Sequence, residues 1–429
     1  MQRWFSERAW MGGASFTHDV LVTTDKGRIT DLTSGADRST GRMAGVTWLD
    51  GVVLPGLVSA HSHAFHRALR GRTHTVGGDF WAWRTPMYTL AGGLDPDKYY
   101  RLAVDVFGEM VRSGVTTVGE FHYVHHQPDG RPYDDANAMG LALVAAAQMV
   151  GIRLTLIDAA YLASSVDGAP VTTDQRRFSD GSVDAWRSRV EDLASELRSH
   201  ATVTLGLAAH SVRGVPADAL VSVAATARDL ETPLHIHVSE QPAENTACLE
   251  THGMSPVSLL ASTGFLGPDT TLVHATHLVE HDLSMVAASG SIVCLCPTTE
   301  ADLGDGIGPA AEFVAAGVPI CLGSDSNAVI DVFREAWAVE QHDRLRLGRR
   351  GVHDPAELLT AATSTGMRSL GWSGGGLRVG SEADFIAVSM DSLDLAGTPG
   401  DLPSVVSSAT RASVTDVVVA GRHIVGRRG

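Results

Sequence analysis

Eight apolar runs separated by helix-like segments predict a (β/α)8 TIM-type barrel, and short strands at both ends of the chain predict an added small β-sandwich domain. The runs are rich in Val, Ile, Leu and Ala, as buried parallel strands are. They occupy residues 52–63, 115–123, 152–162, 202–212, 233–240, 271–278, 291–299 and 318–326. Intervening segments such as 183–199 are rich in Ala, Leu and Arg, which favour helices. The barrel is predicted to span residues 55–371, and the small domain residues 1–54 and 372–429.

Both ends of the chain have the pattern of short strands joined by turns. Residues 20–35 predict a β-hairpin whose turn is Asp25-Lys26-Gly27. After about Gly371 the chain again has glycine-rich turns and short apolar runs, at 383–389 and 416–426. Because the two ends are alike in kind, we expect them to pair in one small β domain.

The bulk composition is that of a large globular chain with an acidic balance. It has 429 residues, of which 44% are hydrophobic, and a formal net charge of −16. That charge disfavours nucleic acid and anionic membranes as partners. No apolar run reaches the roughly 18 residues of a membrane-spanning helix, and the first ten residues lack the apolar core of a signal peptide. We therefore expect a cytoplasmic protein.

The cysteines indicate neither a zinc knuckle nor a disulfide framework. Cys294 and Cys296 alternate within an apolar run, so we expect buried thiols in a strand. The remaining two are Cys248 and Cys321.

The first run ends in His61-Ser62-His63. On a strand, residues i and i+2 point to the same face, so these two imidazoles leave the strand end side by side. Two ligands of a single metal require this arrangement. Taken alone, such a pair is better explained as exposed or hydrogen-bonded histidines, and the metal interpretation depends on distant ligands.

Polar residues end nearly every other run, where a barrel of this kind carries its active site. A single histidine at a strand end is commonly a hydrogen-bonded core residue. A whole series of histidines and acids, in the order HxH, HxxE, H and D, is better explained by a metal site. The strand-end residues after the first run are Glu120, His122, Tyr123, Tyr161, His210, Arg213, His237, Glu240, His274, His277 and Asp325.

From this series we predict one divalent metal ion, Zn²⁺ first among the candidates, although His/Asp sites also accept iron or manganese. The chain has only two lysines, Lys26 and Lys98, and neither lies in a predicted barrel strand. A carbamylated lysine therefore cannot bridge a second ion. His235 also points inward and is expected to be a buried barrel residue. The predicted ligands are His61, His63, His237 and Asp325.

Three of the strand-end residues are predicted to take part in proton transfer. A divalent metal lowers the pKa of water to roughly 7 and makes hydroxide available near neutral pH. Asp325 is placed to take the remaining proton, and His274 to polarise or orient the nucleophile. Glu240 lies one helical step beyond His237 and is placed to carry protons to a leaving nitrogen.

These residues resemble those of the amidohydrolase superfamily, and its mononuclear deaminase branch in particular. The resemblance covers nearly the whole chain, including residues 362–371 and 380–388 after the barrel. HSHAFHRA, FWAWRTPMY, EFHYVHH, HSVR, HIHVSEQ and GSDSN are, more narrowly, similar to segments of formimidoylglutamate deiminases. HxH and HxxE are shared across the superfamily, whereas FWAWR, EFHYVHH and HSVR are much more diagnostic.

The resemblance implies hydrolysis of the formimino group of N-formimino-L-glutamate, giving N-formyl-L-glutamate and ammonia, in histidine degradation. It also implies a homodimer and substrate contacts at Arg84, in the long loop after the first strand, and at Tyr123, His210 and Arg213. Arginine suits a substrate with two carboxylates because its guanidinium forms paired hydrogen bonds to a carboxylate. Either arginine alone is equally explained as a surface or ion-pair residue, and Tyr123 as a rim aromatic.

Position 66 departs from the family pattern, in which the His-Ala-Phe segment is commonly followed by a glutamine that contacts the substrate. A neutral imidazole has one donor and one acceptor, whereas glutamine has two donors and a carbonyl. Histidine can therefore replace one directed bond but not a two-point contact. We predict that His66 binds substrate, with a structural role or a shifted substrate preference as alternatives.

Two other functions are compatible with parts of this pattern. The first is that of a superfamily relative that acts on a cyclic amidine, such as a purine or pyrimidine, or on imidazolonepropionate, none of which carries two flexible carboxylates. A barrel that kept the fold as a non-catalytic scaffold belongs to a different class. The presence of every predicted ligand, base and acid argues against the scaffold.

Overall fold

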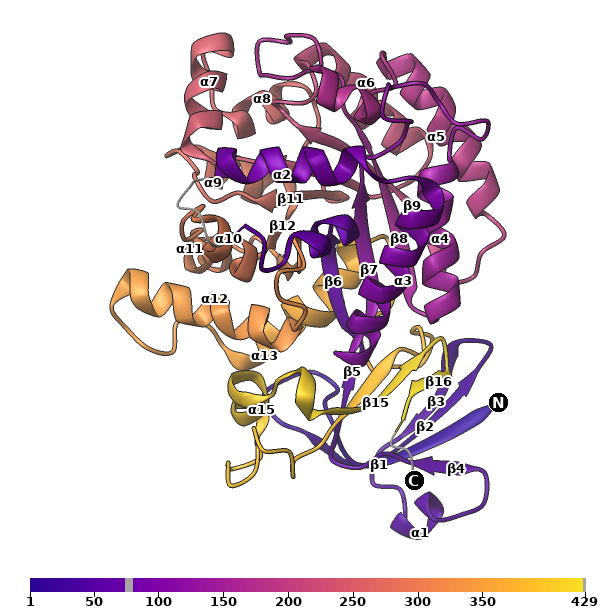
Figure 1. Ribbon diagram of the computed structural model, residues 1–429. Coiled ribbons are helices and arrows are strands. Elements are labelled where there is room, and N and C mark those ends of the chain that lie inside the picture. The colour runs from indigo at the N-terminus through magenta and orange to yellow at the C-terminus, as the bar shows by residue number, and fades with distance from the viewer. Residues whose placement is uncertain (74–79, 427–429) are drawn as a thin grey trace.

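Eight parallel strands form the barrel, one within each predicted run (Figure 1). The computed structural model describes residues 1–73 and 80–426, with the backbone alone for residues 80–82. The strands lie in chain order around the sheet, and a bridge between Ser62 and Asp325 joins the first to the last. The predicted barrel is therefore confirmed. Its strands are β6 (Leu57–Ser62), β7 (Val115–His122), β8 (Arg153–Ala160), β9 (Val203–Ser211), β10 (Leu234–Val238), β11 (Thr270–His274), β12 (Ile292–Leu295) and β13 (Ile320–Leu322).

Helices surround the barrel strands and bury their outer faces (Figure 1). The segment predicted from Ala, Leu and Arg content is helix α5, which begins after the Ser182 cap, whose hydroxyl accepts from the Ala185 amide. Helix α4 ends at Gly151, whose φ of 84° is readily adopted only by glycine. The principal helices of the barrel are α3 (Pro96–Arg112), α4 (Ala138–Val150), α5 (Val183–Leu197), α6 (Ala217–Asp229), α7 (Pro242–His252), α8 (Pro256–Ser262), α9 (Asp282–Ser289), α10 (Pro297–Leu303), α11 (Ala310–Ala315), α12 (Val332–Leu347) and α13 (Pro355–Thr360).

The two ends of the chain form a second, separate sheet, as predicted (Figure 1). The predicted hairpin turn joins two of its strands, and Lys26 and Gly27 have positive φ values of 48° and 78°. The strand that precedes the barrel lies between one strand from each end of the chain. This sheet contains β1 (Gln2–Ala9), β2 (Thr17–Asp25), β3 (Arg28–Thr33), β4 (Val46–Trp48), β5 (Val52–Pro55), β14 (Phe385–Val388), β15 (Val414–Val419) and β16 (Arg422–Val425).

The first predicted run is two strands rather than one, because it passes from one sheet to the other at Pro55-Gly56. Strand β5 pairs with β1 and β14, and strand β6 begins the barrel. A Cβ atom at Gly56 would lie 2.0 Å from the Thr116 hydroxyl, so only glycine fits this crossing. The domain limits themselves, at residues 54/55 and 371/372, remain a prediction.

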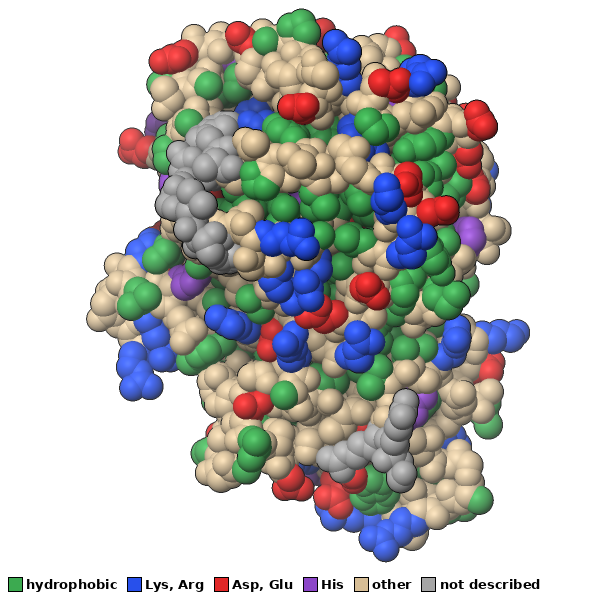
Figure 2. Space-filling view, viewed as in Figure 1, with side chains coloured by type: hydrophobic (Ala, Val, Ile, Leu, Met, Phe, Trp, Pro, Cys, Tyr) green, Lys and Arg blue, Asp and Glu red, His purple; other side chains and the backbone are tan. Residues whose placement is uncertain are grey.

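A buried ion pair joins the two sheets. The Arg153 guanidinium, on β8, donates to both carboxylate oxygens of Asp384 at 2.7 and 3.1 Å. All four cysteines are buried and free; Cys294 lies in β12 as expected, whereas Cys296 directly follows that strand and caps α10. No helix in the described part of the chain is long and apolar enough to cross a membrane. Figure 2 shows acidic and basic side chains interspersed over both the barrel and the small domain on the face viewed.

Candidate active site

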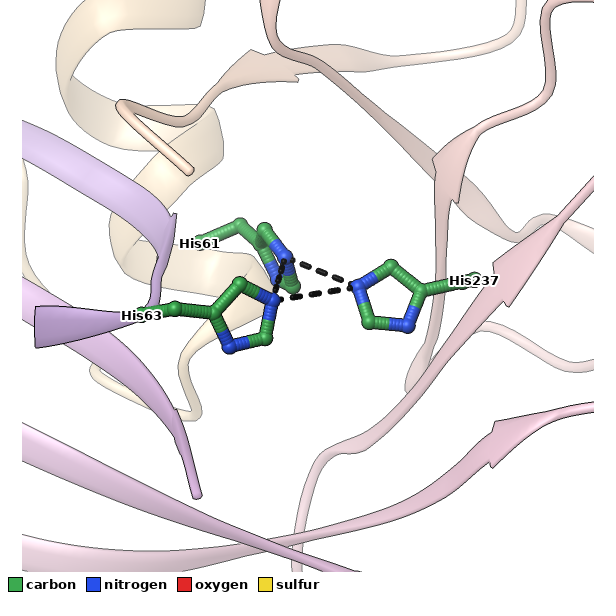
Figure 3. A group of neighbouring side chains, drawn as sticks. All are labelled: His61, His63 and His237. Carbon is green, nitrogen blue, oxygen red and sulfur yellow. Dashed lines mark hydrogen bonds between the residues drawn. The ribbon is translucent and has the colours of Figure 1, made fainter. Parts of the chain in front are cut away.

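Three predicted ligands converge at the carboxyl ends of the barrel strands (Figure 3). His61 and His63 come from the end of β6, and His237 from β10. The distance between Nε2 atoms is 3.1 Å for His61 and His63, 3.0 Å for His61 and His237, and 3.4 Å for His63 and His237. Nitrogen ligands placed tetrahedrally about 2.0–2.1 Å from Zn²⁺ are roughly 3.3 Å apart. The spacing therefore fits a single divalent ion.

The hydrogen bonds of two of these rings fix their tautomers. The Nδ1 atom of His63 donates to the Phe121 carbonyl at 2.9 Å, and that of His237 to the His210 carbonyl at 2.8 Å. A carbonyl only accepts, so each ring carries its proton on Nδ1 and presents a lone pair at Nε2. Two facing lone pairs repel each other unless a cation lies between them. Burial lowers the pKa of His63 and His237, which keeps both rings neutral and ready to bind a metal.

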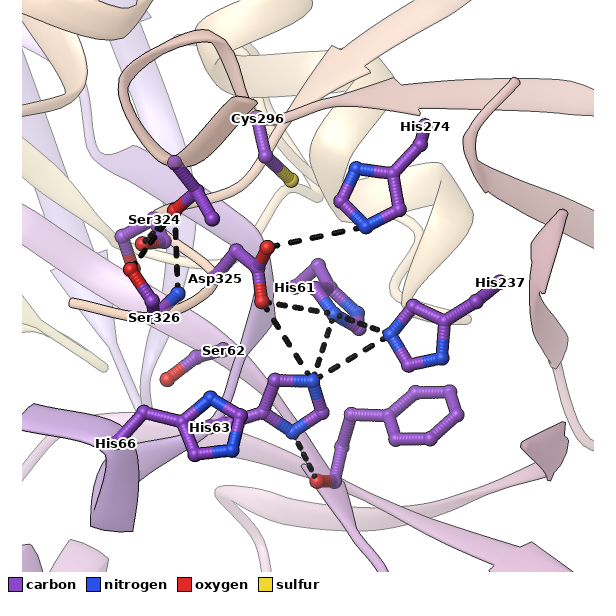
Figure 4. Close-up of polar contacts among 12 residues, drawn as sticks. His61, Ser62, His63, His66, His237, His274, Cys296, Ser324, Asp325 and Ser326 are labelled. Atoms are coloured by element: carbon purple, nitrogen blue, oxygen red, sulfur yellow. Dashed lines mark hydrogen bonds and ion pairs between the residues drawn. The ribbon is translucent and has the colours of Figure 1, made fainter. Parts of the chain in front are cut away.

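Asp325 supplies the fourth predicted ligand (Figure 4). Its Oδ1 atom lies 3.5 Å from the Nε2 atoms of both His61 and His63. The residue follows β13 with a positive φ of 41°, and its backbone N–H donates to the His61 carbonyl at 3.0 Å. Burial alone would raise the pKa of this carboxyl, but the neighbouring imidazoles outweigh it and lower the pKa. The carboxylate is thus held ionised beside the three rings.

Asn327 holds the two ligand-bearing strand ends together. Its side-chain amide lies 3.0 Å from both the Ser62 hydroxyl and the His63 carbonyl, and 3.2 Å from the Asp325 carbonyl. The strand-end pattern of the sequence did not indicate a role for Asn327. Its place in the GSDSN segment, two residues after a ligand, was the available signal.

Glu120 braces the other side of the HxH segment. Its carboxylate accepts from the Ser62 hydroxyl at 2.8 Å and from the Ala64 backbone N–H at 2.6 Å, on either side of His63. Burial raises the pKa of Glu120 to about 8, even though both hydrogen bonds lower it. The sequence predicted that Glu120 lies at the end of the second barrel strand. Its contacts with residues at the end of the first strand could not be predicted, because they depend on the register between the two strands.

His274 lies among three carboxylates at the end of β11. Its Nε2 atom is 3.7 Å from Glu240 Oε1 and 3.8 Å from Asp325 Oδ2, and its Nδ1 atom is 3.3 Å from Glu300 Oε1. Burial would lower the pKa of this imidazole, but the carboxylates outweigh burial and raise the pKa to about 10. His274 therefore lies between the predicted acid and the predicted base, in surroundings that favour its protonated form. Glu300 was not expected at the site.

Arg213 is an ion-pair partner of the predicted proton carrier. Its Nη2 atom donates to Glu240 Oε2 at 3.0 Å, and its Nε atom lies 3.1 Å from Glu244 Oε2. These two carboxylates outweigh burial and raise the pKa of Arg213. The sequence predicted Arg213 at the site but not this pairing.

One pocket of about 670 Å³, its open mouth included, joins the ligands to the other predicted residues. A volume of this size suits a small organic substrate. Of the predicted residues, His61 is fully buried and does not line the pocket. The ten that line it are His63, His66, Arg84, Tyr123, His210, Arg213, His237, Glu240, His274 and Asp325.

Arg84 lies on a helix within the connection that follows the first barrel strand, where we expected a long loop. The connection after β6 contains the short 3₁₀ helix η1 (Ala64–Leu69) and helix α2 (Phe80–Gly92). Within α2 the guanidinium of Arg84 donates to the Tyr88 hydroxyl, one turn further along, and lies 5.4 Å from the centre of its ring. The side chains of Phe80 and Trp81, in the FWAWR segment, lie outside the described residues.

His66 lies on η1 beside the ligands. Its Nε2 atom hydrogen-bonds with the Tyr123 hydroxyl at 3.0 Å, and its Nδ1 atom is buried without a hydrogen-bond partner among the described residues. Burial lowers the pKa of His66 well below its usual value, so the ring is neutral. The Tyr123 ring in turn meets the His210 ring edge to face, with centres 5.3 Å apart.

Other histidines named in the sequence analysis lie outside this group. The Nε2 atom of His235 hydrogen-bonds with the Ser369 carbonyl at 2.8 Å, as expected for a buried barrel residue. His122 and its neighbour His125 lie near Asp158, in a second histidine and carboxylate cluster. The Arg189 guanidinium already pairs with both oxygens of that aspartate, at 2.7 and 2.9 Å, so a cation is disfavoured there.

Fold and site together define a barrel hydrolase with a candidate metal centre. The sequence profile described as "Amidohydrolase family" matches residues 52–424. The chain therefore belongs to the amidohydrolase family, whose members are metal-dependent.

Among its curated relatives, formimidoylglutamate deiminase of Pseudomonas aeruginosa is 37% identical over 393 residues, covering 89% of this chain and 86% of the relative. An 8-oxoguanine deaminase of the same organism is 30% identical, covering 86% of this chain and 81% of the relative. A crystal structure of an amidohydrolase from Brucella melitensis superposes with a TM-score of 0.92 at 32% identity, covering 99% of this chain and 95% of that one. An adenosine deaminase from Xanthomonas campestris, solved with bound zinc, shares the fold with a TM-score of 0.84 at 22% identity, covering 100% of this chain and 93% of that one.

Proposed function

We propose that this amidohydrolase hydrolyses N-formimino-L-glutamate to N-formyl-L-glutamate and ammonia. The observation that carries the proposal is a single pocket that joins the candidate metal ligands, the Glu240–His274 pair and two arginines. A linear amidine with two carboxylates suits the positively charged guanidinium groups of this pocket, of which Arg213 is also paired with Glu240 and Glu244. The 37% identity to a formimidoylglutamate deiminase over most of both chains supports the same substrate.

In the proposed reaction, His61, His63, His237 and Asp325 hold one divalent metal. When bound, such an ion activates water near neutral pH and withdraws charge from the reacting carbon. The two carboxylate oxygens of Asp325 divide two tasks. Oδ1 lies 3.5 Å from the His61 and His63 rings, whereas Oδ2 lies 3.8 Å from His274 and is the oxygen that accepts a proton in this proposal.

Glu240 delivers a proton to the departing nitrogen in this proposal. Arg213 donates to one of its oxygens at 3.0 Å, in a charge-assisted hydrogen bond that fixes the direction of the carboxyl group. The other oxygen lies 3.7 Å from His274 Nε2, and both residues line the pocket. A proton released by the attacking water can thus pass by way of the Asp325–His274–Glu240 group to ammonia.

The proposal predicts that Arg84 binds a substrate carboxylate. Replacing Arg84 with methionine should lower kcat/KM for N-formimino-L-glutamate by roughly 10- to 150-fold, because a lost charge-assisted hydrogen bond costs about 1.5–3 kcal/mol. Steady-state ammonia release, with metal content measured alongside, tests this. Exposed Arg101, changed in the same way, is the matched control. An Arg84→Met enzyme with unaltered kcat/KM would remove this residue from substrate binding.

A second prediction concerns His66, whose buried Nδ1 atom has no hydrogen-bond partner among the described residues, so that bound substrate can supply one. His66→Gln should retain kcat/KM within about tenfold, because an amide can make the same single directed bond. His66→Ala should lose about 1–2 kcal/mol, or roughly 5- to 30-fold. Equal activity in both variants and the wild type would favour a purely structural role. If the wild type did not hydrolyse N-formimino-L-glutamate but the His66→Gln variant did, the natural substrate would be a different amidine.

Ammonia release from a substrate panel tests the function as a whole. The panel contains N-formimino-L-glutamate, its aspartate analogue, an uncharged formimino compound and 8-oxoguanine. We expect the glutamate compound to have the highest kcat/KM. Faster turnover of the uncharged compound would overturn the proposal.

Deamination of a purine is the second candidate, and the 30% identity to an 8-oxoguanine deaminase supports it. The panel separates the two, because 8-oxoguanine has no carboxylate for Arg84 to bind. The predicted homodimer is tested separately by light scattering of the purified protein.

A further inference from the structure

Glu244 is a buried acid that lies just behind the pocket. It belongs to the first turn of α7, and its side chain is 0% exposed. It is absent from the described residues that line the pocket and from the candidate ligand groups. A buried carboxylate is costly unless it is paired, so its presence calls for a specific partner.

The two oxygens of Glu244 contact two different neighbours of Glu240. Oε1 accepts from the Ser239 backbone N–H at 2.8 Å, directly before Glu240 in the chain. Oε2 lies 3.1 Å from Arg213 Nε, in an ion pair without the angle of a hydrogen bond. Arg213 then donates through Nη2 to Glu240 Oε2 at 3.0 Å. Glu244 therefore reaches Glu240 by one route through the backbone and another through a guanidinium.

Both routes restrict orientation. The planar guanidinium of Arg213 donates from Nη2 to Glu240 and from Nε to the Ser211 hydroxyl at 3.4 Å, with the Glu244 carboxylate 3.1 Å from Nε. Turning the group would break these directed bonds and separate it from the Glu244 charge. Ser239 has a positive φ of 49°, a conformation that non-glycine residues hold only when their surroundings impose it. The bond from its N–H to Glu244 is one such constraint.

We propose that Glu244 is a positioning residue, which fixes Arg213 and the backbone before Glu240 so that the Glu240 carboxylate points at the leaving nitrogen. This inference rests on the proposed deimination. It assigns Glu244 no contact with substrate or metal.

The test is a double-mutant cycle measured by ammonia release from N-formimino-L-glutamate. Glu244→Gln keeps an oxygen for the Ser239 N–H but removes the charge opposite Arg213. We expect it to lower kcat/KM about tenfold with unchanged metal content. In the Arg213→Met background the same change should alter kcat/KM less than about twofold, because the two residues act as one unit.

Two further variants separate the routes. Glu244→Ala removes both contacts, so it should lose more activity than Glu244→Gln, and the extra loss should persist in the Arg213→Met background. Glu250→Gln, an exposed change on the same helix, should match the wild type and is the control.

Equal losses from Glu244→Gln in both backgrounds, no loss at all, or a loss that follows melting temperature or metal content would overturn the inference. A wild type that releases no ammonia from the glutamate compound would instead refute the proposed function. The cycle is then run on whichever panel compound the wild type deaminates. If the wild type deaminates none of these compounds, crystal structures of the wild type and of Glu244→Gln test the inference instead. An Arg213–Glu240 pair in the same position in both structures would contradict the positioning role.

Discussion

Replacing His63 with alanine is expected to abolish metal binding and ammonia release together. The Nε2 atom of His63 lies 3.1 Å from that of His61 and 3.4 Å from that of His237, so loss of His63 opens one corner of the ligand set. Changes to the residues that merely support metal ligands typically cost 10- to 100-fold in metal affinity. Loss of a direct ligand should cost more than about 100-fold.

Elemental analysis after exhaustive dialysis, paired with the ammonia assay, checks this expectation. The wild type should hold one equivalent of divalent metal per chain, and His63→Ala should hold less than a tenth of that under the same dialysis, a rough consequence of the affinity loss. Exposed His281→Ala is the control for loss of an imidazole. A fully metal-loaded, active His63→Ala protein would mean that the ligand is misassigned. Two equivalents in active wild type would contradict the single-ion prediction.

The barrel could be predicted from the sequence because each buried strand is an apolar run with polar residues at its end. The pattern of residues 52–63 did not show that the run changes sheets. That change depends on the tight crossing at Gly56 against Thr116, a contact between residues far apart in the chain. The helix that carries Arg84 was missed for a similar reason. It follows a segment that has no clear periodicity, so a loop was the simpler expectation.

The sequence also indicated which residues lie at the site, but not how they pair. Strand-end position brings His274, Asp325 and Glu240 to one side of the barrel without fixing which atoms face each other. The pairing of Arg213 with Glu240 depends on side-chain conformation and on Glu244, which sequence spacing places on the following helix. Asn327 and Glu120 support the ligands through bonds that depend on strand register, which the pattern of apolar residues leaves open.

Glu240→Gln should separate metal binding from proton transfer. Glu240 is in none of the candidate ligand groups among the described residues, so the variant should keep its metal and its melting temperature. The amide can still accept the bond from Arg213, which preserves the geometry, but it cannot carry a proton to the departing ammonia. General acid–base steps of this kind contribute about 10²–10⁴-fold in rate, and kcat should fall by that order.

The Asp325→Asn variant provides a comparison for this prediction. That variant removes a ligand charge as well as a proton acceptor, so it should lose at least as much activity and should also release metal more readily. Measuring kcat, metal content and melting temperature for both variants distinguishes the two roles. If Glu240→Gln turned over substrate at close to the wild-type rate, Glu240 would have no part in proton transfer. If it lost metal as Asp325→Asn does, its role would lie in the metal site instead.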